Sequence, residues 1–180
     1  MSRRREGRFV HTKTEKQIIL EMTETEVLNK VSAYCSAAEH CKSEIVEKIQ
    51  RWGVAYEVIN RVVDKLVQEN FIDEERYCQA FVNDKVRVAK WGKVKIAEAL
   101  KLKKIPFYVY RPYIEKIDQE EYLSMLSALL ASKKKSVHAA TPFELNGKLV
   151  RFALSRGFEM KDICHCLGVS EEEMEEKPEA

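Results

Sequence analysis

Residues 45–54 read IVEKIQRWGV, and their apolar pattern returns twice, as IAEALKLKKI at 96–105 and as LVRFALSRGF at 149–158. Each stretch belongs to the same series of features: an acidic helix start, a helix rich in Lys or Arg, a tight turn and a short apolar helix. Self-similarity with a period of about 50 residues predicts a tandem array in which each unit packs on its neighbour. Such an array offers a partner an extended surface rather than a pocket.

Composition predicts that these units are helical. The chain has 180 residues, of which 45% are hydrophobic, and contains only six Gly and four Pro. No alternating Val/Ile/Thr run bounded by turn residues indicates a strand. Helix N-cap patterns stand at Thr23, Asp73, Asp118 and Thr141. We therefore expect an all-α protein with nine main helices in three tandem three-helix repeats, which form an elongated, curved, right-handed array.

The repeats also set the expected boundaries. We expect a basic flexible N-terminal arm at 1–22, repeats at 23–72, 73–117 and 118–169, and an acidic disordered tail at 170–180. Pro106 and Pro112 should delimit the sixth helix. Trp52 and Phe158, which flank the turn glycines of the first and third repeats, should be packed between helices.

Charge is distributed unevenly along the chain. The net charge is only +2, yet residues 85–116 contain ten Lys and Arg against two Glu, whereas six Glu and one Lys stand in the last ten residues. Lysine-rich helix faces are often merely solvated. Here, however, acidic neighbours are few and four aromatic residues, Trp91, Phe107, Tyr108 and Tyr110, are interleaved with the cations. The basic middle indicates an anionic partner, such as nucleic acid or an acidic protein face.

Cations on equivalent helices of the second and third repeats are the candidate partner-binding residues. They could line one side of the array and face a polyanionic assembly. The predicted set is Lys90, Lys93, Lys95, Lys101, Lys104, Arg111, Lys148, Arg151 and Arg156.

Catalytic and metal-binding motifs are not found. The sequence has no phosphate-cradling glycine loop, no serine nucleophile motif and no helix with paired His ligands, so we expect no enzyme activity, no cofactor and no catalytic residue. Cys164-His165-Cys166 lacks the wider spacing of structural zinc sites, and core packing with an exposed His is the better interpretation. Five cysteines, an odd number, fit a reducing compartment. With no apolar stretch that could span a bilayer, we expect a cytoplasmic monomer without membrane contact.

One segment favours a different function. Residues 158–170 resemble the first helix and turn of a helix-turn-helix, with Ile163 and Leu167 ahead of Gly168-Val169-Ser170. The following residues, Glu171 to Glu176, would be repelled by phosphates if they formed the recognition helix. A DNA-binding protein or transcription factor is therefore the alternative hypothesis.

Residues 71–82 read FIDEERYCQAFV and residues 92–100 read GKVKIAEAL, with Ile105 at the matching distance. These stretches resemble the central signature of the RecX family, the bacterial modulators of the RecA recombinase. The resemblance extends over about residues 24–168 and includes Ser43-Glu44, Gly53-Val54 and 149–158. Where the family usually has Lys-Gly, this chain has Lys103-Lys104, and the basic residues of the third repeat are thinned to 133–135.

The resemblance implies a curved row of three-helix repeats that lies in the groove of a RecA filament on DNA and restrains recombination and ATP hydrolysis. It implies a regulator in DNA repair and the SOS response, without enzyme activity. Its partners would be the RecA filament and, weakly and without sequence preference, single- or double-stranded DNA. The favoured hypothesis is thus a non-catalytic filament regulator.

Overall fold

The computed structural model describes residues 22–175, and these contain ten helices and no strand. The all-helical prediction is confirmed. The predicted N-terminal arm lies outside the described residues, except for Met22. The helices are α1 (Glu24–Ala37), α2 (Lys42–Gln50), α3 (Tyr56–Gln68), α4 (Glu74–Arg87), α5 (Lys93–Leu102), α6 (Phe107–Glu115), α7 (Gln119–Lys134), α8 (Pro142–Ser155), α9 (Met160–Leu167) and α10 (Glu171–Glu175).

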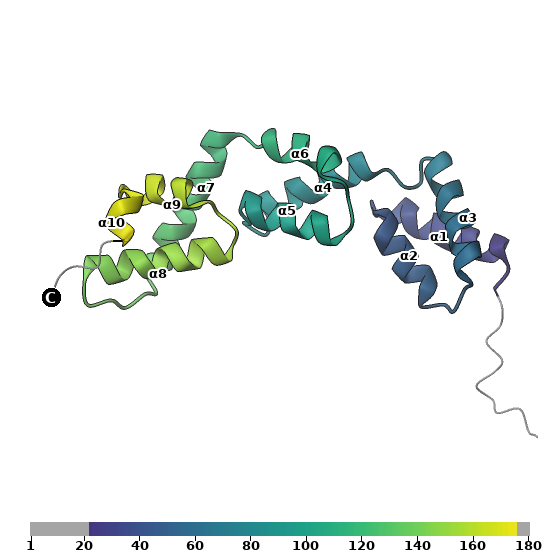
Figure 1. Ribbon diagram of the computed structural model, residues 1–180, viewed down its shortest axis with the longest axis horizontal. Helices are drawn as coiled ribbons and strands as arrows, with labels where there is room; N and C mark the ends of the chain where they lie inside the picture. The colour runs from purple at the N-terminus through teal and green to yellow at the C-terminus, as the bar shows by residue number, and fades with distance from the viewer. Residues whose placement is uncertain (1–21, 176–180) are drawn as a thin grey trace, which may run out of the picture.

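The helices form three groups arranged in a row (Figure 1). Helices α1–α3, α4–α6 and α7–α9 each pack around a separate apolar core, and we call these groups repeats 1, 2 and 3. The row is long and narrow, with α1 near one end and α10 near the other. Its length leaves a large surface relative to the small cores, as expected of a tandem array.

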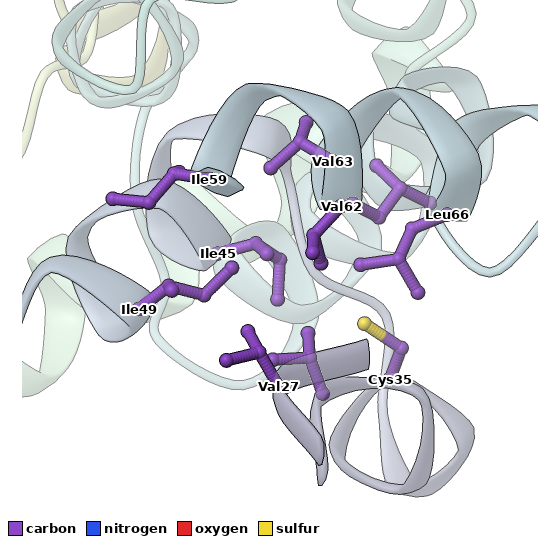
Figure 2. Close-up of a cluster of buried hydrophobic side chains, with 10 residues drawn as sticks. Val27, Cys35, Ile45, Ile49, Ile59, Val62, Val63 and Leu66 are labelled. Atoms are coloured by element: carbon purple, nitrogen blue, oxygen red, sulfur yellow. The ribbon is translucent and has the colours of Figure 1, made fainter. Parts of the chain in front are cut away.

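Each second helix carries the apolar pattern that predicted the repeat. The first apolar position of the pattern is occupied by Ile45, Ile96 or Leu149, and all three are at most 2% exposed. In repeat 1 these side chains meet those of α1 and α3. Figure 2 shows Ile45 and Ile49 of α2 pointing at Val27 of α1 and at Ile59 and Val62 of α3. The period of about fifty residues therefore reports the actual packing unit.

The turn after each second helix has a left-handed residue. Gly53 and Gly157 have φ of 73° and 83°, and Lys104 occupies the equivalent place in repeat 2 with φ of 61°. A side chain in this region is strained by roughly 1–2 kcal/mol relative to glycine. The Lys-Gly to Lys103-Lys104 difference thus leaves the turn conformation unchanged. The register also pairs Trp52 with Arg156 and Val54 with Phe158, so Trp52 and Phe158 are not equivalent.

The residues predicted to cap helix N-termini make the expected capping hydrogen bonds. Thr23 and Glu26 form a complete capping box, and Asp73, Asp118 and Thr141 accept backbone N–H groups of the first turns of α4, α7 and α8. Each cap satisfies donors that the helix cannot pair internally.

Three expectations need correction. Pro112 lies inside α6 instead of delimiting it, so this helix has one internal hydrogen bond fewer. Phe158 is buried as predicted, but Trp52 is only partly buried and lies beneath the ammonium of Lys30. Residues 171–175 form α10, because Ser170 and Glu173 cap each other reciprocally at 2.8 and 3.1 Å. Residues 176–180 lie outside the described residues.

Candidate partner-binding surface

The predicted cations lie in three places on repeats 2 and 3. Lys90, Lys93, Lys95 and Arg156 lie where the two repeats meet. Lys101, Lys104 and Arg111 surround the α5–α6 turn, about 12 Å along the axis of α5 from Lys93. Lys148 and Arg151 are on α8. The nine side chains thus belong to one side-by-side pair of repeats but do not form a single cluster.

Two of the nine have carboxylate partners. Arg111 pairs with Glu115 and Lys148 with Glu144, each at 2.6 Å and each four residues apart on one helix. Lys148 also donates to the carbonyl oxygen of His138 at 2.7 Å. Such exposed pairs contribute only about 0.3–0.5 kcal/mol, so a strong anion could displace them. The other seven form no ion pair within residues 22–175.

The start of α5 is built into the joint between repeats 2 and 3. Gly92, the N-cap of α5, has no capping side chain. Instead, the N–H groups of Gly92 and Val94 donate to the carbonyls of Arg156 and Gly157 at 2.8 and 3.0 Å, and that of Lys93 donates to the Tyr122 hydroxyl at 3.1 Å. Repeat 3 therefore caps a helix of repeat 2.

Close backbone approach makes this joint possible. A Cβ on Gly92 would lie 2.0 Å from the Gly157 oxygen, and one on Gly157 would lie 2.2 Å from the Lys95 Cβ. Both positions therefore require glycine, and Gly157 requires it twice because its φ is 83°.

Several predicted cations are held by this joint. The Lys93 ammonium donates to Gln119 Oε1 at 2.8 Å and lies 4.7 Å from the centroid of the Tyr122 ring. Arg156 donates from Nη1 to the Ala89 carbonyl at 3.3 Å. The ammonium of Lys95 lies 4.7 Å from the Trp91 ring. The contacts of Lys93 and Arg156 join repeats 2 and 3, whereas the contact of Lys95 with Trp91 lies within repeat 2. Lys90, Lys101, Lys104 and Arg151 are exposed.

A cleft of about 590 Å³ opens beside the same joint, between α4 and α6 of repeat 2 and α7 of repeat 3. Arg87, Lys90 and Lys116 line it together with Asp118 and Glu121. Arg87 and Lys116 are not in the predicted set of partner-binding residues, although they line this cleft. Only the charge count over 85–116 pointed to them, because the cleft is formed by helices from two repeats.

Repeats 1 and 2 meet through a different set of contacts. Cys41 at the start of α2 is fully buried in the core of repeat 2. Glu44 pairs with Lys103, accepts a hydrogen bond from the Tyr77 hydroxyl at 3.0 Å, and contacts His40 Nδ1 at 3.2 Å. Burial alone would raise the pKa of Glu44, but the hydrogen bonds from Lys103 and His40 outweigh burial and hold it below its ordinary value. Arg76 adds a pair with Glu39 at 2.9 Å.

Comparison with known proteins shows which family has this architecture. The family model described as "RecX, second three-helix domain" matches residues 73–109. The chain is 28% identical to the regulatory protein RecX of Acinetobacter baylyi over 92% of this chain and 99% of that protein. Over most of its length the chain is similar to RecX proteins. The regulatory protein RecX of Finegoldia magna is 26% identical over 65% of this chain, and that match covers 58% of its length.

Solved RecX structures have the same fold. A crystal structure of regulatory protein RecX superimposes with a TM-score of 0.74 at 16% identity, covering 81% of this chain and 72% of the other. RecX from Lactobacillus salivarius gives 0.72 at 15% identity, covering 81% of this chain and 94% of the other. The curated RecX relatives are named regulatory proteins, not enzymes.

The structure also shows where the possible zinc motif and the helix-turn-helix-like segment lie. Cys164 is buried and His165 exposed, and within residues 22–175 no three His, Cys, Asp or Glu side chains are grouped to hold a metal ion. The helix that follows the helix-turn-helix-like segment is α10, whose first turn is Glu171, Glu172 and Glu173. No described helix is long and apolar enough to cross a membrane.

Proposed function

We propose that this chain is a non-catalytic regulator that binds the RecA nucleoprotein filament and inhibits its ATPase and recombinase activity. The observation that carries the proposal is the set of seven cations that have no carboxylate partner within residues 22–175 and lie on two adjoining repeats of an elongated array. A filament of protein on DNA is a long, repetitive polyanion, which an extended row of basic repeats complements better than a pocket does. Similarity to proteins named regulatory protein RecX supports the proposal.

The acidic start of α10 argues against the alternative. A recognition helix must bring donors to base edges and avoid repelling phosphates, whereas α10 contains four Glu in five residues. We therefore infer that contact with DNA, where it occurs, uses the basic repeats and does not read sequence.

Charge reversal at exposed cations tests the proposal. Lys101, Lys104 and Arg151 are exposed and outside the joint, so their replacement by Glu leaves the fold intact. We expect this triple variant to lose inhibition of a RecA ATPase on single-stranded DNA. In binding assays, the slope of log affinity against log salt should fall by roughly one unit per lost phosphate contact.

The matched control changes charge by the same amount elsewhere. Lys42, Lys134 and Lys135 are also exposed and outside the predicted site, and their replacement by Glu should leave inhibition largely unchanged. Circular dichroism and thermal melting establish that both variants are folded. Full inhibition by the folded Lys101, Lys104 and Arg151 variant would refute the proposed surface.

A further inference from the structure

The turn between α5 and α6 exposes apolar side chains that the repeat core does not use. Leu102 is 83% exposed, Phe107 60% and Tyr108 77%, although Ile105 between them is buried. Phe107 makes an edge contact with buried Tyr110, with centroids 5.5 Å apart, and the Arg111 guanidinium lies 5.6 Å from its ring centroid. One ring is thus held in place and yet remains open to a partner.

Cations surround these aromatic rings. Lys101 and Lys104 are exposed in the same eight-residue stretch and form no ion pair within the described chain, whereas Arg111, which follows one turn later, pairs with Glu115 at 2.6 Å. The first turn of α6 contains no acidic residue. We call Lys101, Lys104, Phe107, Tyr108 and Arg111 the α5–α6 corner.

Repeat 1 has an exposed aromatic residue at the position equivalent to Phe107, but it is not surrounded by cations without ion pairs. Tyr56 is the first residue of α3, as Phe107 is of α6, and it is 62% exposed. Its next neighbour is Glu57 where repeat 2 has Tyr108, and the preceding cation, Arg51, faces Glu47 at 3.9 Å. Of these two repeats, only repeat 2 combines two open rings with two lysines, Lys101 and Lys104, that form no ion pair within residues 22–175.

Unpaired nucleotides fit this combination better than a protein face or a duplex. Protein interfaces concentrate apolar side chains at their centre and are depleted in Lys, whereas here the rings lie among lysines. In a duplex the base faces are covered by neighbouring bases. A single strand offers a base face for each ring and a phosphate for each cation, which is how sequence-tolerant single-strand binding is built.

We propose that the α5–α6 corner binds single-stranded nucleic acid, with bases stacking on Phe107 and Tyr108 and the backbone phosphates held by Lys101, Lys104 and Arg111. This proposal rests on the proposed function, because that function brings the chain to a protein filament on DNA. The contact itself needs only this chain and a nucleic acid, so it can be tested with DNA alone.

The test compares normal and abasic strands. A fluorescent thymidine oligonucleotide of about 20 nucleotides spans one site, and an abasic strand of the same length has the same phosphates without base faces. Replacing Phe107 and Tyr108 together by Ala should weaken binding of the thymidine strand at least about fivefold, the lower end for loss of one stacked base. Binding of the abasic strand should not change.

Matched variants separate stacking from other effects. Tyr56→Ala removes an equally exposed ring from the equivalent position and should leave affinity for the thymidine strand unchanged. Tyr108→Trp should retain affinity, and its added fluorescence should be quenched by the thymidine strand but not by the abasic one. Because these side chains are exposed, circular dichroism should be the same for every variant.

Three results would overturn the proposal. The first is that the unsubstituted chain does not bind the thymidine strand at low salt. The second is that the Phe107 and Tyr108 double variant loses the same amount of affinity for the thymidine strand and for the abasic strand. The third is unchanged oligonucleotide binding by a double variant that no longer inhibits a RecA ATPase. That result would assign the corner to a protein partner and leave the proposed function standing.

Discussion

At the scale of single residues, the joint between repeats 2 and 3 depends on two glycines. Replacing Gly157 by Ala would place a methyl group 2.2 Å from the Lys95 Cβ, in a residue already at φ of 83°. Gly168→Ala is the matched control, since its φ is 68° and nothing lies within 4 Å of the added carbon. Gly168→Ala should cost about 1–2 kcal/mol, the strain alone.

We expect Gly157→Ala to lower the free energy of unfolding by clearly more than the control does, because the backbones of two repeats must separate. Urea unfolding of both variants measures the difference. If both variants lost the same free energy of unfolding, the close contact between the two repeats would not contribute to stability, and the cost would come only from the left-handed backbone conformation.

Residues at the joint also show the limits of sequence reasoning. The pairing of Gly92 with Gly157 joins positions far apart in the chain, and no local period reveals such a contact. By contrast, Glu115 and Glu144 stand four residues from Arg111 and Lys148, so those two ion pairs could have been read from helix spacing. Helix spacing in the sequence can thus identify ion pairs within one helix, whereas contacts between repeats become visible only in the tertiary structure.

At the scale of helices, the pattern of caps and apolar positions predicted the elements well, because both are local. Asp73, Asp118 and Thr141 start helices where predicted, and the repeated apolar positions face the three cores. Charge density misled the prediction at the C-terminal end. Six Glu indicated disorder, yet carboxylates in a first turn stabilise a helix start, and Ser170 caps α10.

Helix α10 nonetheless adds little to the fold. It has five residues and lies against α8 and α9, while the core of repeat 3 is formed by α7, α8, α9 and Phe158. Truncation after Ser170 should therefore leave circular dichroism unchanged and reduce the melting temperature only slightly. A large loss of helix after truncation would show that α10 is required to close repeat 3.

At the scale of the whole molecule, the two joints differ in what holds them. Backbone hydrogen bonds join repeats 2 and 3, whereas ion pairs of Glu44 with Lys103 and of Glu39 with Arg76 join repeats 1 and 2, next to buried Cys41. Salt screens partly exposed ion pairs and leaves backbone hydrogen bonds nearly unaffected. The array should therefore bend more easily between repeats 1 and 2, a difference that a repeat pattern alone cannot predict.

Acid should loosen the same joint. The pKa of Glu44 is held below its ordinary value of 4.5, so the stabilisation it provides is complete above that pH and is lost as the pH falls through the lowered pKa. The groups that face Glu44 are Lys103, Tyr77 and His40. Of these, Lys103 and Tyr77 come from repeat 2, so protonating Glu44 removes the charge that attracts the neighbouring repeat.

Energy transfer between dyes would measure this motion. Dyes introduced through unnatural amino acids at exposed Asn60, Glu98 and Ser132 report the repeat 1–2 and repeat 2–3 distances separately. At a pH below the lowered pKa of Glu44, or at high salt, the Asn60–Glu98 distance distribution should widen while the Glu98–Ser132 distribution stays narrow. Glu44→Gln should widen the first distribution already at neutral pH, because the amide keeps the Tyr77 hydrogen bond but loses the charge. If both distributions widened together, the two joints would be equally flexible, and the ion pairs of Glu44 and Glu39 would not set the stiffness of the array.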